Sequence, residues 1–263
     1  MRKNCLYIGL LLIILSSCSG YEKVLKSTDY NLKYRKAFEY YNKGDYARAS
    51  GVFDQISTVF RGSSKSDSVS FFQAMSAYKQ QDYITAQYYF STFVQTYQYS
   101  PFAEEAEYLA AYCLYLDSPN PELDQENTTR GIEAFQAFMR KYPTSKHYDN
   151  SKEYTTELQD KLVEKSYLSA KLYYNMGGFM LKSAIVALKS SLEDYPNTRY
   201  REEMMWLILD SNFKIAENSI ESKKKDRYQT TIDEYYSFIS EFPQSKWKKE
   251  AQKIYERSEK MTK

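Results

Sequence analysis

Residues 43–53 read Lys-Gly-Asp-Tyr-Ala-Arg-Ala-Ser-Gly-Val-Phe, and residues 80–90, which lie 37 positions later, read Gln-Gln-Asp-Tyr-Ile-Thr-Ala-Gln-Tyr-Tyr-Phe. In both segments Asp-Tyr leads to an Ala and a Phe that are four residues apart, the spacing of one helix face. Asp is a preferred residue at a helix N-cap. The two segments therefore predict a tight turn followed by a helix, repeated with a period of 37 residues.

The residues before each turn repeat with the same period. Aromatic residues or Met recur at positions i, i+4 and i+7, which form one stripe of a helix, and a small Ala lies on the adjoining face, where a neighbouring helix can come close. We call the nine positions of three copies the aromatic stripe: Tyr34, Phe38, Tyr41, Phe71, Met75, Tyr78, Tyr108, Tyr112 and Tyr115. The matching small residues are Ala37, Ala74 and Ala111.

Three later segments keep the second helix of the unit and end in an aromatic residue followed by proline, which stops a helix. These ends are Tyr142-Pro143, Tyr195-Pro196 and Phe242-Pro243, each followed by a Ser or Thr that we expect at the next N-cap. An acidic insertion at Asp117–Asn127 is expected as an exposed loop inside the third unit. A last helix at about Ser245–Lys260 is expected to cap the stack.

The helix, turn and second helix resemble the tetratricopeptide (TPR) repeat. We therefore expect an all-α fold, an α-solenoid of about five TPR-like helix-turn-helix repeats. Units one to three are expected at residues 31–143, and units four and five with the capping helix at residues 144–263. The chain has only 8 Gly and 6 Pro, and it lacks the Asn-Gly and Asp-Gly signals of β-hairpins.

The N-terminal segment has the pattern of a lipoprotein signal peptide. Two basic residues precede an apolar run at residues 6–15, which is too short to span a bilayer, and Leu-Ser-Ser-Cys at residues 15–18 fits the cleavage pattern of bacterial lipoproteins. We expect residues 1–17 to be removed, Cys18 to carry lipid, and residues 18–30 to tether the first repeat to the membrane. The alternative is a soluble secreted protein cut near the same place.

Composition argues against nucleic acid as a partner. The chain has 36 basic and 34 acidic residues, and loss of the signal peptide removes two basic ones, so the mature chain is neutral. The basic run at Gln244–Lys263 could approach anionic lipid or an acidic protein, or it could be the solvated face of a helix.

Side chains suited to catalysis or metal binding are sparse. His147 is the only histidine, and Cys113 is the only thiol left once Cys5 is removed and Cys18 is modified. We therefore expect no metal, no cofactor and no enzymatic activity. A stack of repeats instead offers an extended concave surface for binding.

The aromatic stripe is the candidate binding surface. In TPR proteins the first helix of each unit faces the groove, and the nine stripe residues match its inward-facing positions. Six of them are Tyr, whose hydroxyl needs water or a partner, which favours a wet peptide-binding groove. The alternative is that the rings fill interfaces between helices.

The lipidated N-terminus followed by five TPR-like units resembles the BamD family, the lipoprotein subunit of the machinery that inserts β-barrel proteins into the outer membrane. The most specific stretches are Gly44–Ala49, Lys165–Tyr167 and Tyr195–Glu203. Departures are Phe60-Arg61-Gly62 in place of an aromatic-Pro pair in unit one, and Gly177-Gly178 in the turn of unit four.

The resemblance implies a scaffold on the periplasmic face of the outer membrane. Its C-terminal units would bind the periplasmic repeats of the barrel-forming subunit, and its N-terminal units would bind the extended, aromatic-rich C-terminal signals of unfolded barrel substrates. Ser19 is not the acidic residue that retains lipoproteins at the inner membrane, which favours the outer membrane. The alternative is another TPR lipoprotein that acts as a cell-envelope or division scaffold.

Arg201 is the candidate contact with that subunit. It opens a helix, where a cation gains nothing from the helix dipole, so we expect a carboxylate outside the helix to hold it. The alternatives are a solvated Arg or a local pair with Glu202 or Glu203.

Overall fold

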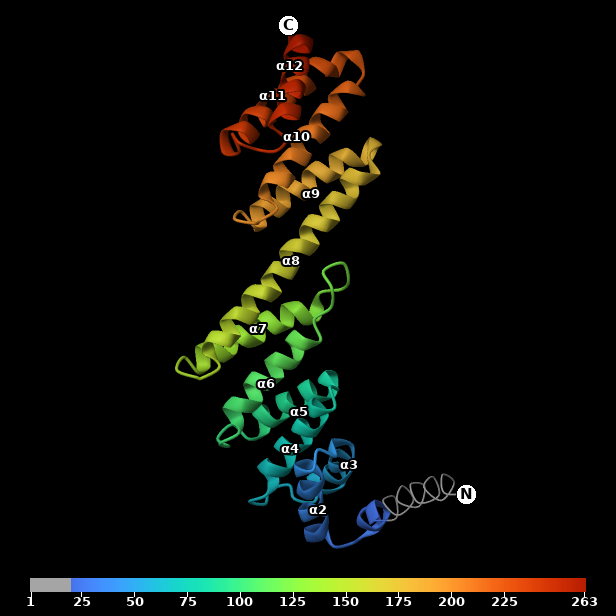
Figure 1. The fold of residues 1–263 in the computed structure, drawn as a ribbon, viewed down its shortest axis with the longest axis vertical. Coiled ribbons are helices and arrows are strands. Elements are labelled where there is room, and N and C mark those ends of the chain that lie inside the picture. Colours follow the sequence, from blue (N-terminus) through green and yellow to red (C-terminus); the bar gives the residue numbers. More distant parts are fainter. Residues whose placement is uncertain (1–19) are drawn as a thin grey trace, which may run out of the picture. The chain divides into compact units, whose positions relative to one another are not determined.

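The structure is a computed structural model that describes residues 20–263. The expected signal peptide and the lipid-attachment residue Cys18 lie outside the described residues. The described part of the chain is helical without strands, and successive helices pack as antiparallel neighbours (Figure 1). The predicted all-α, TPR-like fold class is confirmed.

The described helices follow one another with short connections. They are α2 (Tyr30–Asn42), α3 (Tyr46–Ser57), α4 (Ser66–Lys79), α5 (Tyr83–Thr96), α6 (Ala103–Leu116), α7 (Glu126–Lys141), α8 (Tyr148–Met176), the 3-10 turn η1 (Gly178–Met180), α9 (Leu181–Asp194), α10 (Arg201–Glu217), α11 (Glu221–Glu241) and α12 (Lys248–Thr262). The first helices of the five units are α2, α4, α6, α8 and α10, and α12 is the expected last helix.

The described chain divides into two compact parts, which we describe separately and call unit 1 and unit 2. These differ from the repeats, which are units one to five. Unit 1 comprises the residues up to Pro119 together with Glu126–Leu158, and unit 2 comprises Asn120–Gln125 and Gln159–Lys263. The long helix α8 contributes residues to both.

The turn predicted at Asp-Tyr is confirmed in both copies. The carboxylate of Asp45 accepts a hydrogen bond from the backbone N–H of Arg48 at 3.3 Å, and that of Asp82 accepts one from Thr85 at 3.2 Å. The residue before each Asp has a positive φ, +77° at Gly44 and +62° at Gln81. Glycine adopts this conformation freely and glutamine does so at a cost.

The Ala positions of the first helices are fully buried, because neighbouring helices pack directly against them. Ala37, Ala74 and Ala111 are all 0% exposed. Phenylalanine rings of the second helices fill the space between the pairs, and Phe53, Phe90 and Phe135 are also fully buried. The predicted close approach at the small residues is therefore confirmed.

The first described residues pack on the first repeat. Residues 20–26 are helical, and Val24 is buried in the core cluster of that repeat. The ammonium of Lys33 donates to the backbone oxygen of Leu25 at 2.9 Å. Part of the segment that we expect to act as a tether is thus fixed to the fold.

The acidic insertion forms a loop between α6 and α7, as predicted, but it is shorter than the expected 117–127 because α7 begins at Glu126. Its tip is exposed, and Lys165 donates to the backbone oxygen of Leu123 at 2.6 Å. The last helix, α12, begins and ends slightly later than expected.

The expected N-cap role of the Ser and Thr residues after each aromatic-Pro pair is wrong. Thr198 lies two residues before the N-cap of α10, Tyr200, and its hydroxyl accepts the N–H of that residue at 3.2 Å. Ser245 bonds in the same way to Trp247, the N-cap of α12, at 3.0 Å. The hydroxyl fixes the turn, and the cap position is left to an aromatic residue.

The residue at the N-cap position contacts the preceding repeat. We call this contact the junction contact. The residue just before a first helix, or before α12, lies over the ring of a residue in the preceding first helix. The pairs are Lys65 on Tyr34, Phe102 on Phe71, His147 on Tyr108, Tyr200 on Tyr167 and Trp247 on Trp206. In the four ring pairs the planes are inclined by 14°, 9°, 6° and 5°, so the contacts are stacked.

Candidate peptide-binding surface

Ring contacts join the aromatic stripe of α2 to the first half of α4 in unit 1. On α2 the ring of Phe38 lies 4.8 Å from that of Tyr34. Phe72, on α4, lies 4.9 Å from both Phe38 and Tyr41 and so links two repeats. The rings of α2 and of the first half of α4 therefore form one connected group, and Tyr78 together with the rings of α6 forms a second.

The stripe continues along α6 as a column of rings. Tyr112 lies 5.8 Å from Tyr108 and 5.6 Å from Tyr115, with nearly parallel planes. Tyr78 of α4 lies 6.5 Å from Tyr112, and Tyr154 of α8 lies 4.4 Å from Tyr115. Offset and tilted rings at these distances attract one another beyond the area that they bury.

The stripe residues differ in burial according to their place in the helix. The first positions carry the junction contacts, and Phe71 and Tyr108 are only 6% and 7% exposed. The other stripe residues are half-buried, among them the third positions Tyr41, Tyr78 and Tyr115. Core packing thus accounts for Phe71 and Tyr108, while Tyr34 and the third positions keep a face available to another molecule.

The tyrosine hydroxyls of the third positions are held neutral. Burial raises the pKa of Tyr78 to about 12 and also raises the pKa of Tyr41. The hydroxyl of Tyr115 donates to the carboxylate of Glu157 at 2.5 Å, and this bond together with burial raises its pKa. The neutral hydroxyls of Tyr41 and Tyr78 can therefore donate to a backbone carbonyl, the acceptor that an extended peptide presents, whereas the proton of Tyr115 is already donated to Glu157.

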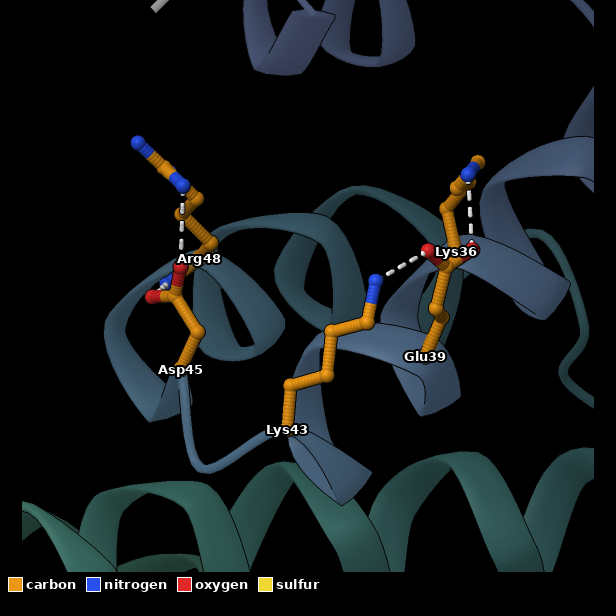
Figure 2. Close-up of polar contacts among 5 residues, drawn as sticks. All are labelled: Lys36, Glu39, Lys43, Asp45 and Arg48. Atoms are coloured by element: carbon orange, nitrogen blue, oxygen red, sulfur yellow. Dashed lines mark hydrogen bonds and ion pairs between the residues drawn. The ribbon is translucent and has the colours of Figure 1, made fainter. Parts of the chain in front are cut away.

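A group of charged residues surrounds the first turn (Figure 2). The carboxylate of Glu39 accepts from Lys36 at 2.6 Å and from Lys43 at 2.8 Å, and these two ammonium groups lower its pKa to about 2. Beside them the guanidinium of Arg48 lies 3.0 Å from the carboxylate of Asp45, which also caps α3. The Gly44–Ala49 motif therefore supplies both the cap of α3 and one ion pair at the turn between α2 and α3.

Arg201 has a carboxylate partner inside unit 2. Its guanidinium makes two hydrogen bonds to Glu241, one of them 2.9 Å from Nη2 to Oε2, and donates to the backbone oxygen of Pro196 at 3.2 Å. Glu203, one of the expected local partners, instead binds Lys171 at 2.7 Å. The pair with Glu241 accounts for the position of the guanidinium without a second protein. Contact of Arg201 with a partner protein stays a prediction.

His147 occupies a junction position. Its Nε2 lies 2.9 Å from the carboxylate of Glu105, and its ring stacks on Tyr108. Cys113 is buried, and burial raises its thiol pKa to about 12. No group of His, Cys, Asp and Glu within residues 20–263 could hold a metal ion, and no helix in that range is long and apolar enough to cross a membrane.

Several residues of this surface lie outside the repeating pattern that predicts the stripe. Phe72, Phe102 and Tyr154 complete the ring network, yet they lie outside the 37-residue register of the stripe. A recurring Ser or Thr followed two residues later by a ring was the available signal for the junction residues.

Antiparallel helix pairs stacked in sequence, with aromatic rings along their first helices, define a helical-repeat protein of the TPR-like class. A family model described as YfiO, outer membrane lipoprotein, matches residues 27–180, more than half of the chain, and the chain therefore belongs to this family. The match ends before α9, so it shows the family for this part of the chain.

A curated protein of Aquifex aeolicus (strain VF5), named putative outer membrane protein assembly factor BamD, is 27% identical over 176 residues. The alignment covers 66% of this chain and 57% of that protein, so the chain spans just over half the length of its relative. The resemblance to the BamD family is thereby confirmed.

Proposed function

We propose that this protein is a lipid-anchored scaffold that faces the periplasm and helps to fold and insert β-barrel proteins into the outer membrane. Membership of a family of outer membrane lipoproteins supports the location, and the name of the Aquifex relative supports a part in assembly. The proposed anchor is Cys18, and the repeats act by binding proteins and not by catalysis.

The half-buried rings of the aromatic stripe carry this proposal. Tyr41, Tyr78 and Tyr115 occur at the same place in three consecutive first helices, so a ligand that binds them must extend across the repeats. An extended strand with aromatic side chains fits such a row, because rings can contact rings without demanding one sequence. We infer that units one to three, at residues 31–143, receive unfolded barrel substrates.

Units four and five, at residues 144–263, are proposed to hold the barrel-forming subunit through its periplasmic repeats. Arg201 remains the candidate contact because its side chain is 32% exposed although it is paired with Glu241. A partner carboxylate could share this guanidinium, since Nη1 is bound only to a backbone oxygen among the contacts of the described residues.

The function is tested by isolating the native lipoprotein from membranes and identifying the proteins that co-purify with it. We expect a barrel-forming subunit with periplasmic repeats, and we expect depletion of the lipoprotein to lower the amount of folded β-barrel proteins in the outer membrane. Recovery of a peptidoglycan-binding lipoprotein instead, with normal barrel assembly on depletion, would favour the cell-envelope or division scaffold.

A further inference from the structure

Unit 2 contains a pocket of about 690 Å³ at the edge where the α8–α9 and α10–α11 turns meet. In Figure 1 these two turns lie on one side of the unit, and the turns that begin α10 and α12 lie on the other. Arg201 begins α10, and Asn218, at the other end of this helix, lines the pocket. Seventeen helical residues span about 25 Å, so the pocket is separate from the Arg201 site.

Cationic side chains from three helices line this pocket. They are Lys182 of α9, Lys214 of α10 and Arg227 of α11, and none of the residues that line it is Asp or Glu. Lys214 is paired at 2.6 Å with Asp210, which lies behind it and is only 14% exposed. The pocket therefore keeps a positive charge after this pair is counted.

The amides of Asn175 and Asn218 add neutral donors and acceptors to the pocket, which suit the backbone of a peptide. The hydroxyl of Tyr174 accepts from Lys214 at 2.9 Å and fixes the position of that ammonium group. These polar groups fix the orientation of a bound peptide, in addition to the charge that the cationic side chains supply.

Large apolar side chains stand exposed at the same place. Phe179 lines the pocket and is 87% exposed, while Met176 and Ile220, close in sequence to lining residues, are 60% and 66% exposed. Exposed apolar side chains that are grouped around a polar pocket are typical of an interaction site.

The Gly177-Gly178 turn creates this arrangement. Gly177 has φ +66° and ψ −161°, a region that is essentially restricted to glycine, and Gly178 has φ +53°. Two such residues reverse the chain sharply after α8 and leave Phe179 projecting into solvent.

We propose that this pocket binds an acidic segment of a partner protein, with carboxylates facing Lys182 and Arg227 and an apolar side chain against Phe179. The positive charge selects a negative ligand, and the amides together with the exposed rim select a peptide over a bare anion. A lipid surface fits less well, because the cations line a recess between helices instead of a flat face. The proposal does not depend on the aromatic stripe.

The test uses the full mature chain in detergent and a fluorescein-labelled hexapeptide with three Asp and one Phe, followed by fluorescence anisotropy. The matched probe replaces each Asp by Asn. We expect the acidic peptide to bind about tenfold tighter at low salt, and Lys182→Glu to remove most of that difference. Phe179→Ser should weaken both probes severalfold.

Lys253→Glu is the matched control, since it makes the same charge change on the exposed face of α12 and should leave binding unchanged. Arg227→Gln gives a second, milder variant in case charge reversal disturbs the fold. Three results would overturn the proposal: no binding of the acidic peptide, equal binding of both probes, or an equal loss with Lys253→Glu. Binding of anionic phospholipid vesicles through Lys182 in place of the peptide would also overturn it.

If variants of the aromatic stripe lose binding of a β-barrel peptide, binding of the acidic peptide to this pocket should be unchanged. The two sites can therefore fail independently.

Discussion

The imidazole ring of His147 lies parallel to the phenol ring of Tyr108, with centroids 3.8 Å apart and planes inclined by 9°. Tyr200 on Tyr167 and Trp247 on Trp206 repeat this geometry in unit 2. The only histidine of the chain thus occupies a position that joins one repeat to the next. The imidazole acts here as a flat ring, as Phe102, Tyr200 and Trp247 do at three other junctions, while Lys65 places an ammonium group over Tyr34 at the first.

Replacing His147 by Ala should lower the free energy of unfolding by about 1–2 kcal/mol, because a stacked, mostly buried ring is lost. His147→Phe should retain most of the stability. Denaturant unfolding followed by circular dichroism measures both variants. Lys152→Ala, at an exposed position of α8, serves as the control, and a loss of equal size there would show that the stack is not the cause.

Gln81 is the single non-glycine residue with positive φ among residues 20–263. Gln81→Gly should raise the free energy of unfolding by about 0.5 kcal/mol, since it relieves a left-handed conformation that costs more than the added freedom of the unfolded chain. Gly44→Ala, at the equivalent turn, should lower it by about 1 kcal/mol although a Cβ would meet no atom within 4 Å. Thermal unfolding of both variants measures these two changes in stability, which should have opposite signs. Changes of the same sign would contradict the assignment of the two turns.

The carboxyl of Glu39 should titrate near pH 2 instead of 4.5, because Lys36 and Lys43 stabilise its charged form. Its folded-state pKa is lowered, so its contribution to stability is present above pH 4.5 and is lost as the pH falls from 4.5 towards 2. Carbon-detected NMR of the side-chain carboxyl measures the midpoint. Lys36→Met with Lys43→Met should return it towards 4.5, and an unchanged midpoint would reject the pairing.

Arg201→Glu should weaken co-purification of the barrel-forming subunit, and its effect must be separated from the loss of the pair with Glu241. Glu241→Gln breaks the same pair but leaves the cation free, so it should preserve complex recovery while it lowers stability by no more than about 1 kcal/mol. Recovery measured from membranes distinguishes the two variants. Equal recovery with Arg201→Glu and with the wild type would remove Arg201 from the interface.

Cys18→Ala should leave the precursor uncleaved or release the protein from the membrane, because the proposed anchor is the lipid on this residue. Membrane fractionation and intact-mass measurement follow both outcomes. Normal processing with wild-type fractionation would contradict the lipoprotein assignment of this residue.

The repeat could be predicted because its signals are local. Ala37, Ala74 and Ala111 recur at a fixed spacing, and each lies where two helices must approach closely. Asp45 and Asp82 bond within their own turns, three residues away. Period and capping therefore fix the helices and turns without knowledge of tertiary contacts.

The partners of side chains across the fold could not be predicted in the same way. Glu241 lies 40 residues after Arg201, and no periodic pattern links them. The expected cap at Thr198 failed because the sequence shows a hydroxyl before a helix but not which N–H it meets. The stripe was identified as one surface, whereas its first positions are junction rings and its third positions remain half-buried.

The binding role of the half-buried rings is tested most directly by the affinity of the mature chain for a C-terminal peptide of an outer membrane β-barrel protein. Tyr41→Ala, Tyr78→Ala and Tyr115→Ala together should weaken this affinity severalfold or more, since each aromatic contact contributes about 0.5–1.5 kcal/mol beyond its area. The control replaces Tyr88 and Tyr99, which are exposed and outside the stripe, by Ala. We predict weaker binding only in the stripe variant; unchanged affinity with circular dichroism equal to the wild type would contradict the assignment of the aromatic stripe as the peptide-binding surface.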